Sequence, residues 1–275
     1  MKKTTRAPLL LLAILPLLGR VPAWAIAFTS SFESIKIDGR PGETVNRQFQ
    51  LRLAPGGKRV HFKARTEDWW PSEDGSRSFY RPAGTLPRSC GPWITLNPVE
   101  TAVDPGGILE IRVTAAIPRA ARPGGYWCVL TVDEAPDPLD VPQGVEVRFL
   151  ASVSIGIFIN LEPVERAAEI RNVELSRGQA RLKVCNLGNA PIGAEGRIEF
   201  LPAGKSAPAA TAVVPRATVL TDPAPCRILA ADLPGPSSLP PGRYLVLVLL
   251  DIGVDHYLGL QKELEIGRDL LSPGP

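Results

Sequence analysis

Residues Val145–Leu161 read VEVRFLASVSIGIFINL, and this stretch decides the fold class. An apolar residue stands at every second position, and most of the positions between them carry polar residues or glycine. Because successive side chains of a β-strand point to opposite faces of a sheet, this alternation indicates a strand with one buried face. The strand would span about 50 Å, which is longer than strands usually are. We therefore expect it to bend or break near Gly156. The apolar positions are Val145, Val147, Phe149, Ala151, Val153, Ile155, Ile157, Ile159 and Leu161.

The rest of the chain repeats the strand signal in shorter pieces. Turns such as Pro105-Gly106-Gly107 and Pro123-Gly124-Gly125 separate apolar stretches about every ten residues, which is typical of a β-sandwich or barrel. The segment Leu161–Arg166 is interpreted as a linker, and a second series of short strands follows it. We predict an all-β fold with two β-sandwich domains in tandem, over residues 26–162 and 163–275.

Residues 1–25 have the composition of a secretory signal peptide. A basic start is followed by a mostly apolar run over residues 7–18, and the segment ends on Ala23-Trp24-Ala25, which suits cleavage after Ala25. The alternative is an uncleaved membrane anchor, but the apolar run is shorter than the ~20 residues that span a bilayer. We expect a periplasmic or extracellular protein whose mature chain does not insert into a membrane.

The positive charge of the chain belongs to this leader. The sequence holds 31 Lys and Arg against 28 Asp and Glu, and four of the basic residues but none of the acidic ones lie in residues 1–25. Cleavage would leave 27 basic and 28 acidic residues, a formal charge of −1. Binding to nucleic acid or to an anionic membrane relies on an excess of Lys and Arg. We therefore expect neither as a partner.

The four cysteines divide evenly between the predicted domains. Cys90 and Cys128 lie in the first, and Cys185 and Cys226 in the second. Four cysteines allow three pairings, of which one disulfide within each domain is the simplest in an oxidising compartment. A zinc site is the alternative, but it would favour CxxC pairs or nearby histidines. The sequence has neither.

The sequence contains no recognisable catalytic motif. Its two histidines, His61 and His256, fall in different predicted domains, and neither GxSxG nor HExxH occurs. Gly204-Lys205-Ser206 imitates the end of a phosphate-binding loop, but Pro202 interrupts the loop and Glu199 stands where its first glycine should be. We predict no catalytic residue and no cofactor, and hence a protein that is not an enzyme.

Four acidic residues are interpreted as solvated surface carboxylates because nothing in the sequence pairs them. The stretch Glu73–Ser76 lacks the alternating acidic ligands of a calcium-binding loop, so we predict no metal site. The four residues are Asp68, Glu73, Asp74 and Asp251.

A loop rich in aromatic residues lies between Arg65 and Arg81. Rigid rings in a polar loop can bind a glycan or a protein, since they bury a large area at little entropic cost. The alternative, which we favour, is that Trp69 or Trp70 covers the sandwich core. The possible ligand-binding residues are Trp69, Trp70, Phe79 and Tyr80.

Three stretches resemble the immunoglobulin-like domain of periplasmic pilus-assembly chaperones. They are Ser89–Pro98 (SCGPWITLNP), Gly125–Val132 (GYWCVLTV) and the end of the alternating strand, Ile155–Ile159 (IGIFI). The resemblance covers roughly residues 30–162, with a second domain in the same order. It implies two immunoglobulin-like β-sandwich domains.

The resemblance also implies a function. In these chaperones the alternating strand fills a groove in an immature pilus subunit, and an arginine and a lysine between the domains anchor the subunit's terminal carboxylate. Here the first strand offers Lys36, and the usual lysine position in the long strand falls on Gly156. The partner-binding residues implied are Val145, Val147, Phe149, Val153, Ile155 and Ile157.

The sequence therefore predicts a non-catalytic exported protein. Its partner would be a protein subunit of a surface appendage or envelope complex, bound by β-strand addition. The alternative is a structural or adhesive module of the cell envelope that binds wall glycan or protein through the aromatic loop.

Overall fold

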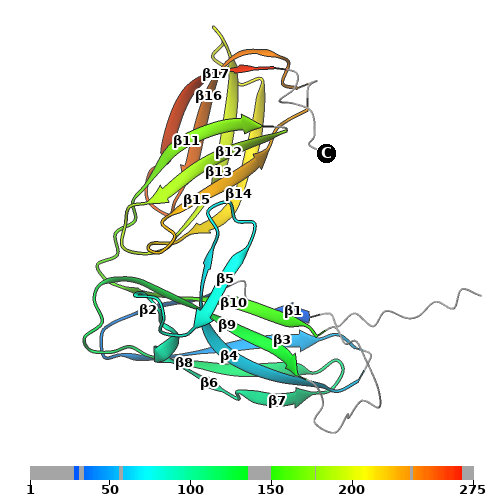
Figure 1. The fold of residues 1–275 in the computed structure, drawn as a ribbon, viewed down its shortest axis with the longest axis vertical. Coiled ribbons are helices and arrows are strands. Elements are labelled where there is room, and N and C mark those ends of the chain that lie inside the picture. The colour runs from blue at the N-terminus through cyan, green and yellow to red at the C-terminus, as the bar shows by residue number, and fades with distance from the viewer. Residues whose placement is uncertain are drawn as a thin grey trace, which may run out of the picture.

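The computed structural model describes residues 28–30, 34–55, 58–135, 150–176, 178–235 and 238–267. The expected signal peptide and three of the proposed partner-binding residues, Val145, Val147 and Phe149, lie outside these ranges. Within them every regular element is a β-strand except the 3₁₀ turn η1 (Gly91–Trp93), and no helix is long and apolar enough to cross a bilayer. The predicted all-β fold is confirmed, and Figure 1 shows two sandwiches, the second standing upright above the first, whose strands run across the picture.

The first sandwich consists of two facing sheets. One has the strand order β1-β3-β8-β6, and the other has the order β2-β10-β9-β4-β5 with β7 paired to β4. The strands are β1 (Phe28–Ser30), β2 (Ser34–Gly39), β3 (Thr44–Leu53), β4 (Val60–Pro71), β5 (Ser78–Pro82), β6 (Ile94–Asn97), β7 (Glu100–Val103), β8 (Ile108–Ala116), β9 (Gly124–Ala135) and β10 (Ser152–Leu161).

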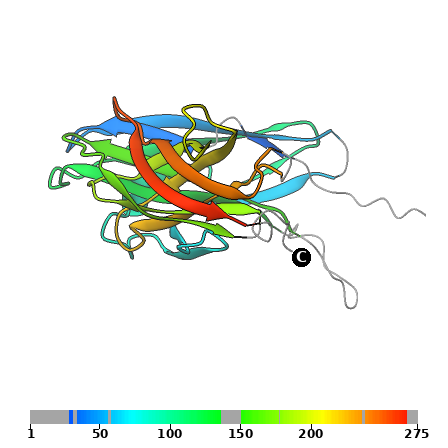
Figure 2. The same cartoon turned by 90° about the horizontal axis from the view of Figure 1, so that it is seen from above.

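The second sandwich pairs a sheet of order β11-β12-β15 with a sheet of order β14-β13-β16-β17. Seen from above, β16 and β17 cross the strands of the first sandwich obliquely (Figure 2). The strands are β11 (Ala168–Ser176), β12 (Gln179–Asn186), β13 (Ile192–Pro202), β14 (Ala210–Val219), β15 (Cys226–Asp232), β16 (Gly242–Asp251) and β17 (Leu258–Ile266).

Each sandwich has its own hydrophobic core. The first core contains Phe49, Ile111 and Leu130 among others, and all of its members lie between Ile35 and Leu161. The second core includes Leu182, Phe200 and Val248 and extends from Val173 to Ile266. These are the two immunoglobulin-like β-sandwich domains that the sequence predicted.

The alternation that decided the fold class is present in β10. Ile155, Ile157, Ile159 and Leu161 are buried, whereas the residues between them are partly exposed. The expected break near Gly156 is wrong, because β10 pairs with β9 in continuous register from Ser152 to Leu161. Gly156 has a strand partner on both sides, Val129 on β9 and Ser34 on β2, and these pairings hold the strand together.

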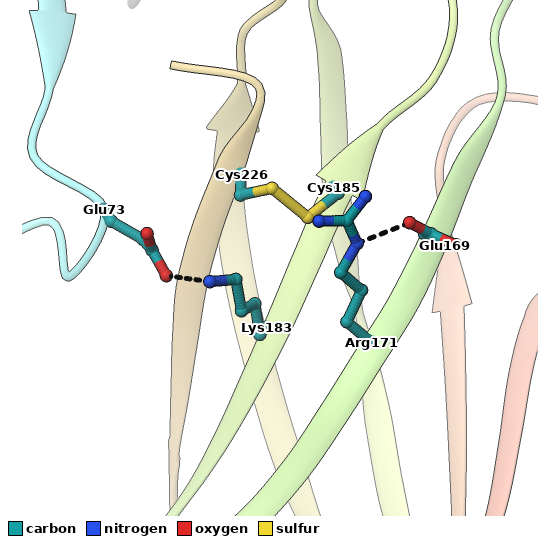
Figure 3. Close-up of a disulfide and its surroundings, with 6 residues drawn as sticks. All are labelled: Glu73, Glu169, Arg171, Lys183, Cys185 and Cys226. Atoms are coloured by element: carbon teal, nitrogen blue, oxygen red, sulfur yellow. Dashed lines mark hydrogen bonds and ion pairs between the residues drawn. A yellow bond between two sulfur atoms is a disulfide. The ribbon is translucent and has the colours of Figure 1, made fainter.

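The predicted disulfides have different outcomes. Cys185 and Cys226 are bonded and connect β12 to β15 (Figure 3). Cys90 and Cys128 are not bonded in the structure, but their Sγ atoms face each other 2.8 Å apart, against the disulfide length of about 2.05 Å, so the bridge expected in the first domain stays a prediction. Burial raises the pKa of the Cys90 thiol, which keeps it protonated, and the thiolate is the form that reacts.

Candidate functional site

The C-terminal part of β10 is enclosed by two neighbouring strands. It is antiparallel to β9 along its whole length, and it is parallel to β2 from Gly156 to Leu161. Before Gly156 no residue in the described part of the chain pairs with β10 on the β2 side, and residues 31–33, which precede β2, lie outside the described ranges. We call this four-residue segment, Ser152–Ile155, the open edge.

The register shows which backbone groups of the open edge point away from β9. The amide of Glu134 donates to the carbonyl of Ala151, so this pair belongs to the hydrogen-bonded class of an antiparallel ladder. Such pairs recur at every second residue, which directs the backbone of Val153 and Ile155 toward β9. The amide and carbonyl of Ser154 therefore point away from β9, into the open edge.

The side chains of β10 are less available than the sequence predicted. Ile155 is 5% exposed and Ile157 is completely buried, because both fill the first core. The expectation that these two side chains contact a partner does not fit this burial. Val153 is half-buried and packs against the edge of the core. Of the proposed residues that the structure describes, Val153 alone presents a partly accessible side chain.

A cleft of about 920 Å³ lies between the two domains, next to the open edge. Its floor is the outer face of the sheet formed by β2, β10, β9, β4 and β5. The opposite wall comes from the second domain. The lining residues from β10 and β2 are Ser154, Gly156, Phe158, Asn160, Ser34 and Lys36, and the second domain contributes Ile192, Arg216, Asp251 and Ile252.

The cleft has an excess of unpaired positive charge. Lys36 and Arg166 line it, and neither forms an ion pair with a described residue. Arg216 is already paired with Glu195, and the carboxylate of Asp251 accepts the amide hydrogen of Gly253 at 2.7 Å. An anion entering the cleft would thus meet Lys36 and Arg166, which have no ion-pair partner among the described residues, and also the carboxylate of Asp251.

The aromatic loop forms the hairpin of β4 and β5, in which Trp69 pairs with Tyr80 and Trp70 with Phe79. The rings of Trp70 and Phe79 stack at 5.4 Å between centroids. Trp69 and Tyr80 line the cleft instead. Neither tryptophan belongs to the first core, so the favoured interpretation that one of them covers this core is wrong. The hairpin extends away from the core toward the second domain (Figure 1).

The tip of the hairpin is attached to the second domain. The carbonyl of Glu73 accepts the amide hydrogen of Ile228 at 2.6 Å, and its carboxylate pairs with Lys183 at 2.6 Å (Figure 3). Lys183 and Ile228 are opposite each other on β12 and β15, two pairs from the Cys185–Cys226 disulfide. The hairpin therefore closes one end of the cleft as a bridge between the domains.

One predicted surface carboxylate is buried. Asp68 is completely inaccessible, and it accepts hydrogen bonds from the Leu86 amide at 2.7 Å and from the Ser89 hydroxyl. These donors satisfy the carboxylate and fix the loop before η1, so Asp68 has a structural role. Glu73 and Asp74 are exposed as expected, but Glu73 is paired with Lys183, and the bond from the Ser72 hydroxyl helps to lower the pKa of Asp74 to about 2.

Sequence reasoning missed several cleft residues. Phe158 occupies a position of the alternating strand assigned to the more polar face, and the linker residue Arg166 carried no signal beyond its charge. Lys36 was noticed through the resemblance and does line the cleft. Among the described residues no group of three or more His, Cys, Asp or Glu could hold a metal ion.

No protein-family model matches the chain, and no curated protein is similar to it in sequence. Solved structures of fimbrial chaperones are similar to it in fold. A chaperone–tip adhesin complex of CFA/I fimbriae biogenesis has 12% identity and a TM-score of 0.46, covering 86% of this chain and 98% of the other. The chaperone DraB of E. coli has 16% identity and a TM-score of 0.42, with 87% and 99% coverage. The chaperone CupB2 of Pseudomonas aeruginosa has 13% identity and a TM-score of 0.41, with 87% and 100% coverage.

Proposed function

We propose that this chain is an exported, non-catalytic chaperone-like protein that binds an extended segment of an envelope or surface-appendage subunit. The observation that carries the proposal is the open edge at Ser152–Ile155. An incoming strand can pair there with the backbone groups of Ser154, which have no strand partner on that side among the described residues, and continue the sheet, as in other cases of β-strand addition. The expected periplasmic or extracellular location and cleavage after Ala25 are part of this proposal.

The cleft provides two cations that would bind the end of the partner segment. Lys36 lies on β2 opposite Phe158 of β10, on the cleft side of the sheet, and Arg166 follows β10 in the linker. A strand that pairs with the open edge and continues into the cleft would bring its end toward these two cations. A terminal carboxylate there would neutralise charge that has no partner among the described residues. The adhesive alternative is less well supported, because the hairpin that would bind glycan is engaged by the second domain.

Proline at position 154 tests the open edge. We expect Ser154→Pro to reduce recovery of the bound partner at least about tenfold, because it removes one free donor and places a ring where the partner strand would lie. Pairing with β9 should survive, since edge strands accept proline where the amide faces outward. The measurement is quantitative mass spectrometry of proteins captured from the source envelope by the immobilised mature protein.

The matched control is Ser154→Ala, which keeps the backbone donor and removes only the hydroxyl, which lies 3.4 Å from that of Thr131. A protein that is retained by the native chain and by Ser154→Ala but lost with Ser154→Pro is the expected partner. If every captured protein is retained equally by the proline variant, strand addition at this edge is excluded.

A further inference from the structure

The floor of the cleft contains an aromatic ring that lies over a glycine. A Cβ atom built on Gly156 would stand 2.8 Å from Cε2 of Phe158, closer than carbon atoms approach without displacement. The ring of Phe158 thus occupies the space that a side chain at position 156 would fill. Both residues line the cleft, so the glycine lets the Phe158 ring lie flat against the sheet on the cleft side.

Two more aromatic residues line the cleft on the other side of β9. Trp69 and Tyr80 are paired across β4 and β5, and both line the same cleft as Phe158. Tyr80 is 42% exposed. The indole Nε1 of Trp69 is buried without a hydrogen-bond partner among the described residues. We call Phe158, Trp69 and Tyr80 the aromatic floor.

The charges at the border of the aromatic floor restrict what can occupy it. Lys36 and Arg166 are unpaired within the described part of the chain, so a neutral glycan or an apolar segment would leave both cations without a counter-charge. A peptide end that combines a carboxylate with a ring satisfies both features. The ring adds stacking to area burial, and the carboxylate adds charge-assisted hydrogen bonds.

We propose that the aromatic floor selects a partner segment whose last residue is aromatic and carries a free carboxylate. The ring of that residue packs on Phe158, on the side that faces Trp69 and Tyr80, and the carboxylate lies between Lys36 and Arg166. This inference rests on the proposed function and adds the identity of the terminal residue to it. Gly156 and Phe158 are then specificity-determining residues of the cleft.

Three synthetic peptides test this selection. Each is an acetylated nine-residue peptide in which threonine and valine alternate before the last residue. The first ends in phenylalanine with a free carboxylate, the second in alanine with a free carboxylate, and the third in phenylalanine amide. We expect the mature, full-length protein to bind the first peptide about three- to tenfold more tightly than the second, from the energy of one aromatic contact. It should also bind the first more tightly than the third. Fluorescence anisotropy of labelled peptides measures the dissociation constants.

Two variants test whether the aromatic floor causes the preference for the phenylalanine peptide over the alanine peptide. Phe158→Ala removes the ring, and Gly156→Ala keeps the ring but displaces it, so both should bind the phenylalanine and alanine peptides equally. The matched control is Phe79→Ala, which removes a partly exposed ring of the same sheet that stacks on Trp70 and does not line the cleft. This control should keep the native preference.

The outcomes separate the inference from the proposed function. Equal affinity of the native protein for the phenylalanine and alanine peptides would overturn the aromatic selection and leave strand binding intact. Preference retained in both Phe158→Ala and Gly156→Ala would overturn the assignment to this floor. If none of the three peptides binds the native protein, the proposed function and the inference fall together.

Discussion

Trp127→Ala is expected to lower the free energy of unfolding of the first domain by about 3–5 kcal/mol. Trp127 is completely buried, yet it does not belong to the sandwich core. It lies opposite Phe158 in the β9–β10 register and therefore on the cleft face of the sheet. Its indole Nε1 donates to the carbonyl of Trp69 at 3.0 Å, and its backbone bonds to Arg88 and Cys90. Truncation would leave a cavity beneath the cleft and free the Trp69 carbonyl.

Trp127→Phe separates the two contributions. It retains most of the buried area but removes the indole donor, so a smaller loss of about 1–3 kcal/mol is expected. Urea unfolding followed by far-ultraviolet circular dichroism measures both variants, with the two domains fitted as separate transitions. A loss below about 1 kcal/mol for Trp127→Ala would contradict the packing described for this residue.

Removal of the Cys185–Cys226 disulfide is expected to destabilise the second domain by about 4 kcal/mol in the chain-entropy model. The two cysteines are 41 residues apart in the sequence, so the bond shortens a long loop of the unfolded chain. The double variant Cys185→Ser with Cys226→Ser tests this without leaving an unpaired thiol. The same bond connects the two strands that receive the Glu73 tip of the hairpin, and the variant should therefore also loosen the bridge between the domains.

Reductant provides the control for this variant. Dithiothreitol should lower the stability of the native protein by the same amount and leave the double serine variant unchanged, because Cys90 and Cys128 are not bonded in the structure. Guanidinium unfolding with and without reductant measures both effects. A native protein equally stable in both conditions would contradict the contribution assigned to this disulfide. Further destabilisation of the double variant by reductant would indicate a bond between Cys90 and Cys128.

The sequence predicted the individual strands better than it predicted which strands pair with one another. Alternation in β10 correctly identified the buried face at Ile155, Ile157 and Ile159, since that pattern depends only on the two-residue period of a strand. It carried no information on pairing, so it could not reveal that β2 covers the strand from Gly156 onward. These isoleucines recur at every second position because their side chains fill the core. The same burial prevents those side chains from contacting a partner.

The candidate site could be predicted only in part, because it is assembled from distant segments. Lys36, Phe158 and Trp69 line one cleft because β2 pairs in parallel with β10 and because the β4–β5 hairpin is long, and neither feature is local in sequence. Asp68 was assigned to the surface by residue type. Its burial depends on two donors 18 and 21 residues further along the chain. Charge and hydropathy patterns do not report such specific partners.

Hydrogen exchange of single backbone amides in β10 tests the open edge most directly. In the free mature protein, the amide of Ser154 should exchange at least about a hundredfold faster than those of Val153 and Ile155, which are bonded to β9. Addition of the phenylalanine peptide should slow exchange at Ser154 and leave its two neighbours unchanged. Equal protection of all three amides in the free protein, measured by nuclear magnetic resonance, would show that another strand already occupies this edge and would contradict the account.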